Sequence, residues 1–196
     1  MDPVLQKAVT ALQNGGVVVY PTDTVYGFGA DATQQRAIQK IAFLKGRDAA
    51  AKPFLVMVQN MEMLAEYAVV TPIAQRLADA FLPGPLTLIL EQKGTALDYI
   101  SAQGGQGIGF RIPKNEICMA LVEGAGKPIV STSVNKSGMP HIASMSEIQK
   151  RFPEVDVYVD AGELPTSAPS TIVDARGDTA RIVRDGALTI DVSMLL

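Results

Sequence analysis

The sequence has very few of the side chains on which disulfides and zinc sites depend. Its 196 residues include one cysteine, Cys118, and one histidine, His141. A single cysteine excludes a disulfide within the chain, and it is typical of proteins in a reducing compartment such as the cytoplasm. Zinc sites take three or four ligands, mostly from Cys and His, so we expect no zinc site built from this chain. His141 follows a proline in a loop and is interpreted as a surface group rather than a general base.

Long apolar runs are also lacking. Proline, glycine or a charged residue interrupts each apolar stretch well before the roughly 18 residues that a membrane-spanning helix needs. The first ten residues, MDPVLQKAVT, are amphipathic and carry an acid at position 2, unlike a secretory signal. We therefore expect a cytoplasmic protein with no membrane partner. A formal net charge of −3 disfavours bulk electrostatic binding of nucleic acid, although a local basic patch remains compatible with it.

What is present predicts a mixed fold in one domain over residues 1–196. Apolar residues at helical spacing predict helices at residues 4–12, 33–44, 61–67, 72–81, 118–123 and 144–151, the last with Ser144 and Glu147 as a capping box. Short apolar or β-branched runs predict strands at residues 17–20, 53–58, 86–90, 107–113, 127–132, 155–159, 170–174, 181–184 and 188–191. The glycine-rich segment TDTVYGFGADA, residues 22–32, is expected to be irregular. The pattern is typical of an α/β (α+β) protein, with a twisted mixed parallel/antiparallel sheet flanked by helices.

A polar segment, STSVNKSG, follows one of the predicted strands. Its Ser131, Thr132, Ser133, Asn135 and Ser137 can all donate and accept hydrogen bonds. Such residues commonly satisfy their own backbone in turns, but open α/β sheets also bind ligands at the ends of their strands. Sequence alone leaves both interpretations open. The preceding GAGKPIVS imitates a phosphate-binding loop, but proline follows its lysine and a strand follows the segment, so we reject that function for it.

Two sets of cations raise the question of an anionic ligand. Lys45, Arg47 and Lys52 lie close together in FLKGRDAAAKPF, which is either a solvated helix end or an anion site. Arg111 interrupts an otherwise apolar strand, and a buried arginine must be paired with a structural carboxylate or with an anionic ligand. Together with the polar segment, these cations indicate a protein that binds an anionic or phosphorylated small molecule.

These segments, taken in order, resemble the YrdC-like family. The matching stretches are GGVVVYPTDTVYGFGADA, LKGR, KPFLVMV, PGPLTLIL, FRIP, STSVNKSG, STIVD and RIVRDG, which run from Gly15 to Gly186. Characterised members of this family are L-threonylcarbamoyladenylate synthases, and the resemblance is to their short form with a single catalytic domain. It implies a sheet that forms a concave, basic cavity. It also implies that L-threonine, bicarbonate or carbon dioxide, and ATP give threonylcarbamoyl-AMP and pyrophosphate, toward N6-threonylcarbamoyladenosine at position 37 of tRNAs that read ANN codons.

The resemblance further implies roles for individual residues. The implied catalytic set is Lys45, Arg47, Ser133 and Asn135. The implied L-threonine set is Thr24, Arg111, Ser133 and Ser170, with the planar Arg111 guanidinium on the substrate carboxylate. The implied ATP set is Lys45, Arg47, Lys52, Ser131, Asn135 and Arg184. Magnesium is expected to arrive with ATP, and no protein-bound zinc, flavin or NAD is expected.

Two departures from the family pattern keep other functions open. Asp48 stands where relatives usually have proline, with three alanines before Lys52, and Met57 stands where many relatives have a polar residue. One alternative is an RNA-binding or ribosome-maturation module of the same fold. Another is a carbamoyladenylate-forming relative that uses carbamoyl phosphate. Weak binding of tRNA or double-stranded RNA, and transfer of the product to threonylcarbamoyl-transfer machinery, are the further partners expected.

Overall fold

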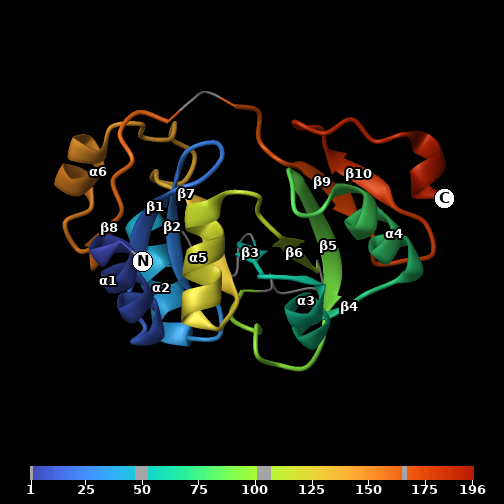
Figure 1. Ribbon diagram of the computed structural model, residues 1–196, viewed down its shortest axis with the longest axis horizontal. Helices are drawn as coiled ribbons and strands as arrows, with labels where there is room; N and C mark the ends of the chain where they lie inside the picture. The colour runs from blue at the N-terminus through green and yellow to red at the C-terminus, as the bar shows by residue number, and fades with distance from the viewer. Residues whose placement is uncertain (1, 47–52, 101–106, 165–166) are drawn as a thin grey trace.

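The computed structural model describes residues 2–46, 53–100, 107–164 and 167–196 of the chain (Figure 1). Its helices are α1 (Pro3–Gln13), α2 (Gln35–Lys45), α3 (Met61–Tyr67), α4 (Pro72–Phe81), α5 (Glu116–Ala125) and α6 (Met145–Arg151), with a 3-10 helix η2 (Val192–Leu195). Its strands are β1 (Val18–Pro21), β2 (Tyr26–Asp31), β3 (Leu55–Met57), β4 (Ala68–Val69), β5 (Leu86–Gln92), β6 (Ile108–Arg111), β7 (Ile129–Ser133), β8 (Val157–Tyr158), β9 (Thr171–Asp174) and β10 (Arg181–Arg184). The predicted bounds of α3 and α4 are confirmed to the residue.

The strands form one twisted sheet in the order β10-β9-β5-β6-β3-β7-β2-β1-β8, and β4 pairs with β5. The pairs β1/β8, β3/β6 and β5/β9 are parallel, and the other pairs are antiparallel. The predicted mixed sheet is therefore confirmed. The short β3 lies near its middle, so it joins an N-terminal half (β7, β2, β1, β8) to a half built from β6, β5, β9 and β10 (Figure 1).

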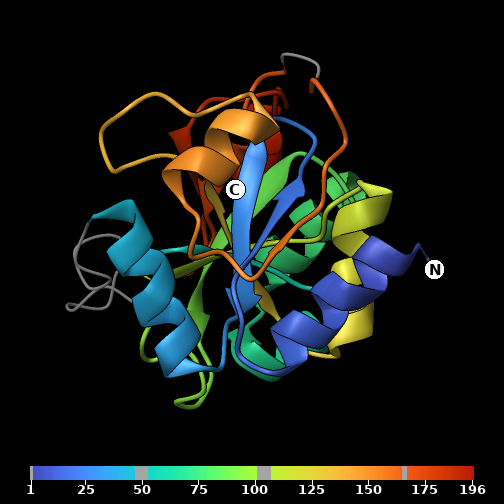
Figure 2. The ribbon, with the colours of Figure 1, turned by 90° about the vertical axis from the view of Figure 1, so that its left-hand side faces the viewer.

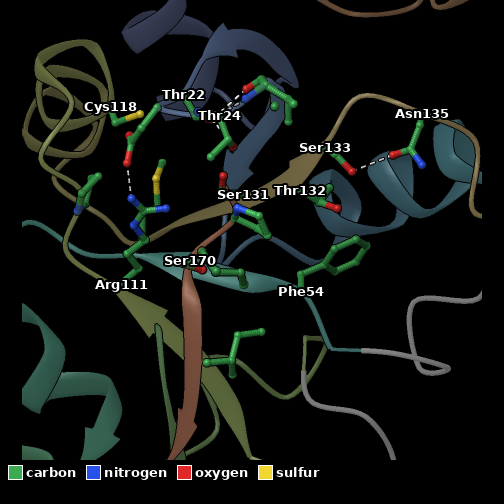
Figure 3. Close-up of a pocket in the computed structure, with 18 of the residues that line it drawn as sticks. Thr22, Thr24, Phe54, Arg111, Cys118, Ser131, Thr132, Ser133, Asn135 and Ser170 are labelled. Carbon is green, nitrogen blue, oxygen red and sulfur yellow. Dashed lines mark hydrogen bonds and ion pairs between the residues drawn. The ribbon is translucent and has the colours of Figure 1, made fainter. Parts of the chain in front are cut away.

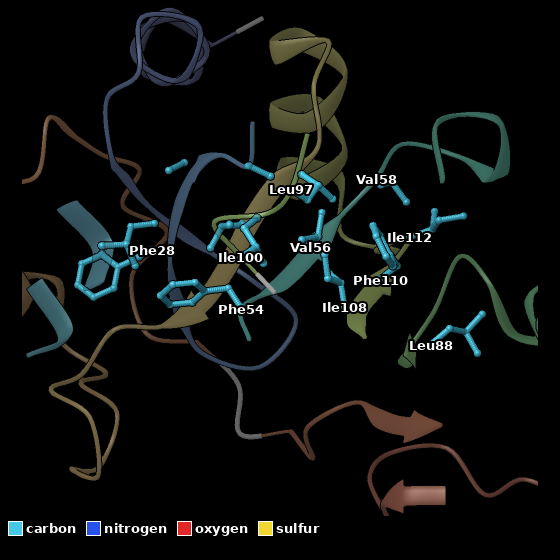
Figure 4. Packing of buried hydrophobic residues seen from close by; sticks show 14 of the residues in the cluster. Phe28, Phe54, Val56, Val58, Leu88, Leu97, Ile100, Ile108, Phe110 and Ile112 are labelled. Atoms are coloured by element: carbon cyan, nitrogen blue, oxygen red, sulfur yellow. The ribbon is translucent and has the colours of Figure 1, made fainter. Parts of the chain in front are cut away.

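Alternating side chains bury both faces of β1. Val18 and Tyr20 of β1 pack in one hydrophobic cluster with the buried faces of α1 and α5, whereas Val19 belongs to the other, larger cluster with α2. Figure 2 shows α1 and α5 side by side on one flank of the N-terminal half and α2 on the opposite flank. This period of two is what a strand buried on both faces requires. The larger cluster extends along the sheet from Phe28 to Leu88 (Figure 4).

Most of the glycine-rich segment after β1 is a strand, so the expectation of an irregular backbone over residues 22–32 was wrong for Tyr26–Asp31. All six residues of β2 are buried, and they pair with both β1 and β7. A Cβ at Gly29 would lie 2.7 Å from Cε1 of Tyr20, and one at Gly27 would lie 3.3 Å from Cγ2 of Thr22. The glycines therefore make room for neighbouring side chains within a sheet, which is a recognised use of glycine in strands.

Two predictions near the C-terminal side of the chain were also wrong. Residues 188–191 form no strand, because the N–H and C=O of Leu188 bond to the Thr171 hydroxyl, at 3.1 and 2.7 Å, instead of to a partner strand. Ser144 does precede α6, but its side chain caps no backbone N–H. Its hydroxyl instead lies 2.8 Å from the Ser146 hydroxyl, and Glu147 pairs with Arg151 one turn later, so the capping box is absent.

Candidate active site

A cavity of about 470 Å³ lies where the two halves of the sheet meet. Its walls come from the β1–β2 loop, the end of β7 and the loop that follows, and segments at β3, β6, β9 and β10 (Figure 3). The structure brings together, on this one wall, all the predicted site residues that it describes: Thr24, Lys45, Arg111, Ser131, Ser133, Asn135, Ser170 and Arg184. Arg47, Asp48 and Lys52 lie outside the described residues, so their predicted roles stay predictions.

The β1–β2 loop is organised by one hydroxyl. The Thr22 side chain donates to the carbonyl of Val25 at 2.7 Å and accepts from the N–H groups of Thr24 and Val25, each at 3.2 Å. Threonine commonly bonds to its local backbone in this way when a chain must turn. The turn presents Asp23 and Thr24 at its tip, where both line the cavity.

Arg111, at the end of β6, has the structural carboxylate that one interpretation of the sequence required. Its Nη2 donates to Oδ2 of Asp23, and its Nε donates to the Gly84 carbonyl at 3.0 Å. The residue is 9% exposed and lines the cavity, so the guanidinium is fixed in orientation while facing the open space. Sequence analysis missed Asp23 as this partner.

A second arginine reaches the same wall from β10. Nη2 of Arg184 donates to the carbonyl and hydroxyl oxygens of Ser170, at 2.8 and 3.3 Å. The Ser170 hydroxyl in turn lies 2.8 Å from the Thr87 hydroxyl in the interior. Burial lowers the pKa of Arg184, although it stays a cation at any physiological pH. Arg184 is an exposed residue of the edge strand β10, and these bonds hold it against Ser170 at the cavity.

The polar segment 131–138, at the end of β7, is consistent with both interpretations that the sequence left open. The Ser133 hydroxyl donates to Oδ1 of Asn135 at 2.7 Å, and the Asn135 amide donates to the carbonyls of Lys136 and Met139 at 3.0 and 2.6 Å. These bonds shape the turn internally. The same Ser133 and Asn135, with Ser131, line the cavity (Figure 3).

Lys45 holds this turn against α2. It is 4% exposed, and its Nζ donates to the Ser133 carbonyl at 2.6 Å, to Oδ1 of Asn135 at 2.9 Å and to the Asn135 carbonyl at 3.3 Å. The ammonium also lies 5.9 Å from the centre of the Phe28 ring, within the range of a cation–π contact. A buried charge needs such partners, and here neutral dipoles supply those that the structure describes. The helix-end cluster is therefore not simply solvated at Lys45.

The cavity is backed by Tyr20, which sequence analysis did not single out, and by Cys118 and Met57. The Tyr20 hydroxyl donates to Oγ of Ser131 at 2.8 Å, and burial raises the pKa of Tyr20 well above its ordinary value. Burial also raises the pKa of the Cys118 thiol to about 12, and its Sγ lies 3.6 Å from the Pro21 carbonyl. Met57 is 2% exposed and lines the same wall. Tyr20 could have been suspected from its place at the end of a strand just before the PTDT motif.

The site has two chemically distinct ends. In Figure 3, Arg111 lies toward one side of the cavity, and Ser133 and Asn135 lie toward the other. Among the described lining residues, Lys45, Arg111 and Arg184 are cationic and Asp23 is anionic, which agrees with the basic cavity implied by the resemblance. Such an arrangement can bind an anionic or zwitterionic small molecule at the Arg111 end and further polar groups at the Asn135 end. The cavity is therefore typical of small-molecule sites that position their ligands and stabilise negative charge on them.

The described residues were searched for clusters of metal-ligating side chains and for helices that could span a membrane. Over residues 2–46, 53–100, 107–164 and 167–196, no group of three or more His, Cys, Asp and Glu side chains is placed to hold a metal ion. None of the helices in these ranges is long and apolar enough to cross a membrane.

Comparison with known proteins identifies the family. The Sua5/YciO/YrdC family model, described as "Telomere recombination", matches residues 10–186. The chain belongs to this family. The expected YrdC-like membership and fold are thereby confirmed.

Individual relatives agree with this assignment. The threonylcarbamoyl-AMP synthase of Pyrococcus abyssi is 32% identical over 95% of this chain and 55% of its own length. The crystal structure of P. abyssi Sua5 complexed with L-threonine is 31% identical, with a TM-score of 0.81 over 93% of this chain and 54% of that one. The crystal structure of Escherichia coli YciO is also 31% identical, with a TM-score of 0.83 over 98% of this chain and 92% of that one. The chain therefore spans about half the length of the P. abyssi relatives and nearly all of YciO.

Proposed function

We propose that this protein is a threonylcarbamoyl-AMP synthase, which joins L-threonine, bicarbonate or carbon dioxide, and ATP, and releases pyrophosphate. The observation that carries the proposal is the convergence of eight residues on one cavity wall. They were assigned to threonine or ATP from motifs spread over the whole chain. The P. abyssi relatives support the two halves of the proposal, since one is named for the synthase reaction and the other is a structure with L-threonine.

The amino acid belongs at the Arg111 end. The Arg111 guanidinium is held by Asp23 and by the Gly84 carbonyl, so its remaining nitrogen is directed without the cost of ordering a free side chain. A planar guanidinium suits a carboxylate. The hydroxyls of Thr24 and Ser170 lie on the same wall and would contact the rest of the amino acid.

The nucleotide belongs at the Asn135 end. Ser131, Ser133 and Asn135 present hydroxyl and amide groups there, and Lys45 fixes the turn that carries two of them. Arg47, the second cation of the Lys-x-Arg motif, would contact phosphate. Magnesium would come with ATP on its phosphates, because the described cavity wall offers the single carboxylate of Asp23, which is already paired.

The chemistry then needs positioning more than acid–base catalysis. A neutral threonine amine attacks carbon dioxide and loses a proton, which gives a carbamate. A carbamate oxygen attacks the α-phosphorus in line and pyrophosphate leaves, so the C–O–P linkage forms as the bond to the β-phosphate breaks. Both steps gather negative charge, which nearby cations and fixed donors stabilise. The product would be passed on to threonylcarbamoyl-transfer machinery that modifies tRNA.

Purified protein tests the proposal directly. With ATP, magnesium, L-threonine and bicarbonate, we expect pyrophosphate release and a product with the mass of threonylcarbamoyl-AMP, and omission of threonine should abolish both. Failure of complete mixtures to form either product contradicts the synthase. Pyrophosphate release that requires carbamoyl phosphate instead of threonine would identify the alternative carbamoyladenylate chemistry. A mobility shift with double-stranded RNA at physiological salt, together with absence of turnover, would identify the RNA-binding module.

A further inference from the structure

Thr87 and Ser170 form a pair of hydroxyl groups at the cavity wall. Their oxygens lie 2.8 Å apart, and this distance alone fits a hydrogen bond in either direction. Thr87 lies in β5 and is 1% exposed, and its hydroxyl has no other partner in the described chain. Ser170 directly precedes β9 and is 5% exposed, and it lines both the main cavity and an adjoining one of about 380 Å³. Which of the two donates decides what Ser170 can offer a ligand.

The direction of this bond follows from what a buried hydroxyl requires. A buried O–H group without an acceptor has lost its hydrogen bond to water and gained none in return. If Ser170 donated to Thr87, the Thr87 proton would have no described acceptor. If Thr87 donates, its proton is satisfied, and only the Ser170 proton still needs an acceptor. Since Ser170 lines the cavities and Thr87 does not, the second arrangement lets a ligand satisfy both groups, and Thr87 is the donor.

The Ser170 oxygen is then fully used as an acceptor. A hydroxyl oxygen has two lone pairs and one proton. Thr87 occupies one lone pair, and Nη2 of Arg184 donates to the other at 3.3 Å. Arg184 is an exposed residue that lines the main cavity, so an oxygen within its reach lies on the cavity side of the wall. Ser170 can therefore donate to a ligand but cannot accept from one.

The position of Ser170 indicates which group of the ligand it meets. Thr24, Arg111 and Ser170 all line both of the cavities, and Figure 3 shows Ser170 on the Arg111 side, away from Asn135. This is the end that we propose for the amino acid. A carboxylate only accepts hydrogen bonds and an ammonium group only donates them. A serine that can only donate, next to Arg111, therefore suits the carboxylate and not the amine.

We infer that Thr87 is a positioning residue for the amino acid, because its hydrogen bond to Ser170 commits the Ser170 O–H to an oxygen of the substrate carboxylate. This inference rests on the proposed function. Thr87 touches no ligand and acts only through Ser170. A hydrogen bond to a charged acceptor is stronger than one between neutral groups, and a donor that is oriented before binding loses less freedom when the carboxylate arrives.

Isothermal titration of L-threonine into the intact protein, with and without unreactive α,β-methylene-ATP, tests the inference. Thr87→Val keeps the side-chain shape but frees the Ser170 hydroxyl to rotate, and it should weaken binding about three- to tenfold. Thr87→Ser keeps the donor and should stay within about twofold of the wild type. Ser170→Ala removes the bond to the carboxylate and should weaken binding about ten- to hundredfold. Adding Thr87→Val to Ser170→Ala should change the affinity by less than about twofold, because Thr87 then has no hydroxyl to orient.

Thr71→Val is the matched control. The Thr71 hydroxyl donates to the Ala175 carbonyl at 2.8 Å and lines neither cavity, so its loss should lower the melting temperature and leave the affinity for threonine unchanged. If Thr87→Val does not fold in a thermal melt, Thr87→Ala takes its place with the same expectations, since it differs from Thr87→Ser by the hydroxyl alone.

Three results overturn the inference. They are an unchanged affinity in Thr87→Val, an equal loss in Thr87→Ser, which would indicate packing, and a Thr87→Val effect that persists when residue 170 is alanine, which would indicate a structural role. If the wild-type protein ignores threonine but binds another α-amino acid with the same dependence on Thr87 and Ser170, the proposed function fails and the inference stands. If it binds no α-amino acid, both are overturned.

Discussion

The variant Lys45→Met tests whether Lys45 is needed more for activity, by fixing the turn at the nucleotide end, than for the stability of the fold. Methionine approximates the length of lysine but removes the ammonium that bonds Ser133 and Asn135. Oδ1 of Asn135 keeps its bond from the Ser133 hydroxyl, but the two carbonyls lose the lysine donor, which should cost about 1–3 kcal/mol of unfolding free energy. The desolvation penalty of a buried charge is relieved at the same time. The melting temperature should therefore fall by only about 2–4 °C for each kcal/mol lost at this chain length.

Activity should fall much further than stability. The Ser133–Asn135 turn loses the cation that fixes it, and losing one preorganised group at a developing charge commonly costs about 10²- to 10³-fold in kcat. Pyrophosphate release at saturating ATP and threonine measures this effect. Lys40→Met on the same helix is the matched control, because Lys40 pairs with Asp156 away from the cavity and should affect stability alone. A Lys45→Met enzyme within about threefold of wild-type kcat would refute the assigned role, since the expected loss is far larger.

Three further predictions concern Tyr20 and Cys118 behind the cavity and Asp156 away from it. Tyr20→Phe removes the donor to Ser131 and should lower the unfolding free energy by about 0.5–1.5 kcal/mol in denaturant titrations, and an unchanged midpoint would contradict it. Burial raises the pKa of Cys118 from 9.0 to about 12, so the unfolded chain loses its thiol proton first and stability should fall as the pH rises through this window; Cys118→Ala should remove that part of the slope. Burial opposes the lowering of the Asp156 pKa, but hydrogen bonds from Lys40 and a backbone N–H outweigh it. Its stabilisation should be lost as the pH falls below 3.8, and Asp156→Asn should flatten that acid limb.

The elements that sequence predicted well are those determined by local pattern. Helices α3 and α4 begin after Asn60 and Thr71, whose side chains accept backbone N–H bonds in the way that polar residues before a helix usually do. The β2 strand was missed because Gly27 and Gly29 are needed to make room for the side chains of Thr22 and Tyr20. Those side chains reach β2 only once the sheet has formed, so the segment's own sequence does not reveal the need. Glycine content alone cannot distinguish a flexible loop from a strand on which other side chains crowd.

In the candidate site, too, residues that belong to local motifs could be predicted, whereas contacts between distant segments could not. Arg111 and Ser133 could be selected because their motifs carry a family resemblance, and the structure places both on the cavity wall. Asp23 could not be assigned to Arg111, since the two are 88 residues apart and no spacing rule relates a hairpin tip to a strand end. Whether Arg111 faces a structural carboxylate or a ligand was undecidable from its strand, and the folded chain accommodates the first while leaving room for the second.

The position of the three-residue β3 at the join between the two halves of the sheet has a consequence for folding and ligand binding. The cavity wall draws on residues from Thr22 to Arg184, so the site depends on contacts of high sequence separation, which form late and slowly in folding. Neither half expressed alone should retain affinity for threonine or ATP. A ligand that spans both ends fastens the two halves to each other, and at a hundred times its Kd it should raise the global unfolding free energy by about 2.7 kcal/mol. In native-state hydrogen exchange, the amides of β3 and β7 should exchange more slowly when substrate is bound. Substrate binding would then stabilise the contact between the two halves of the sheet.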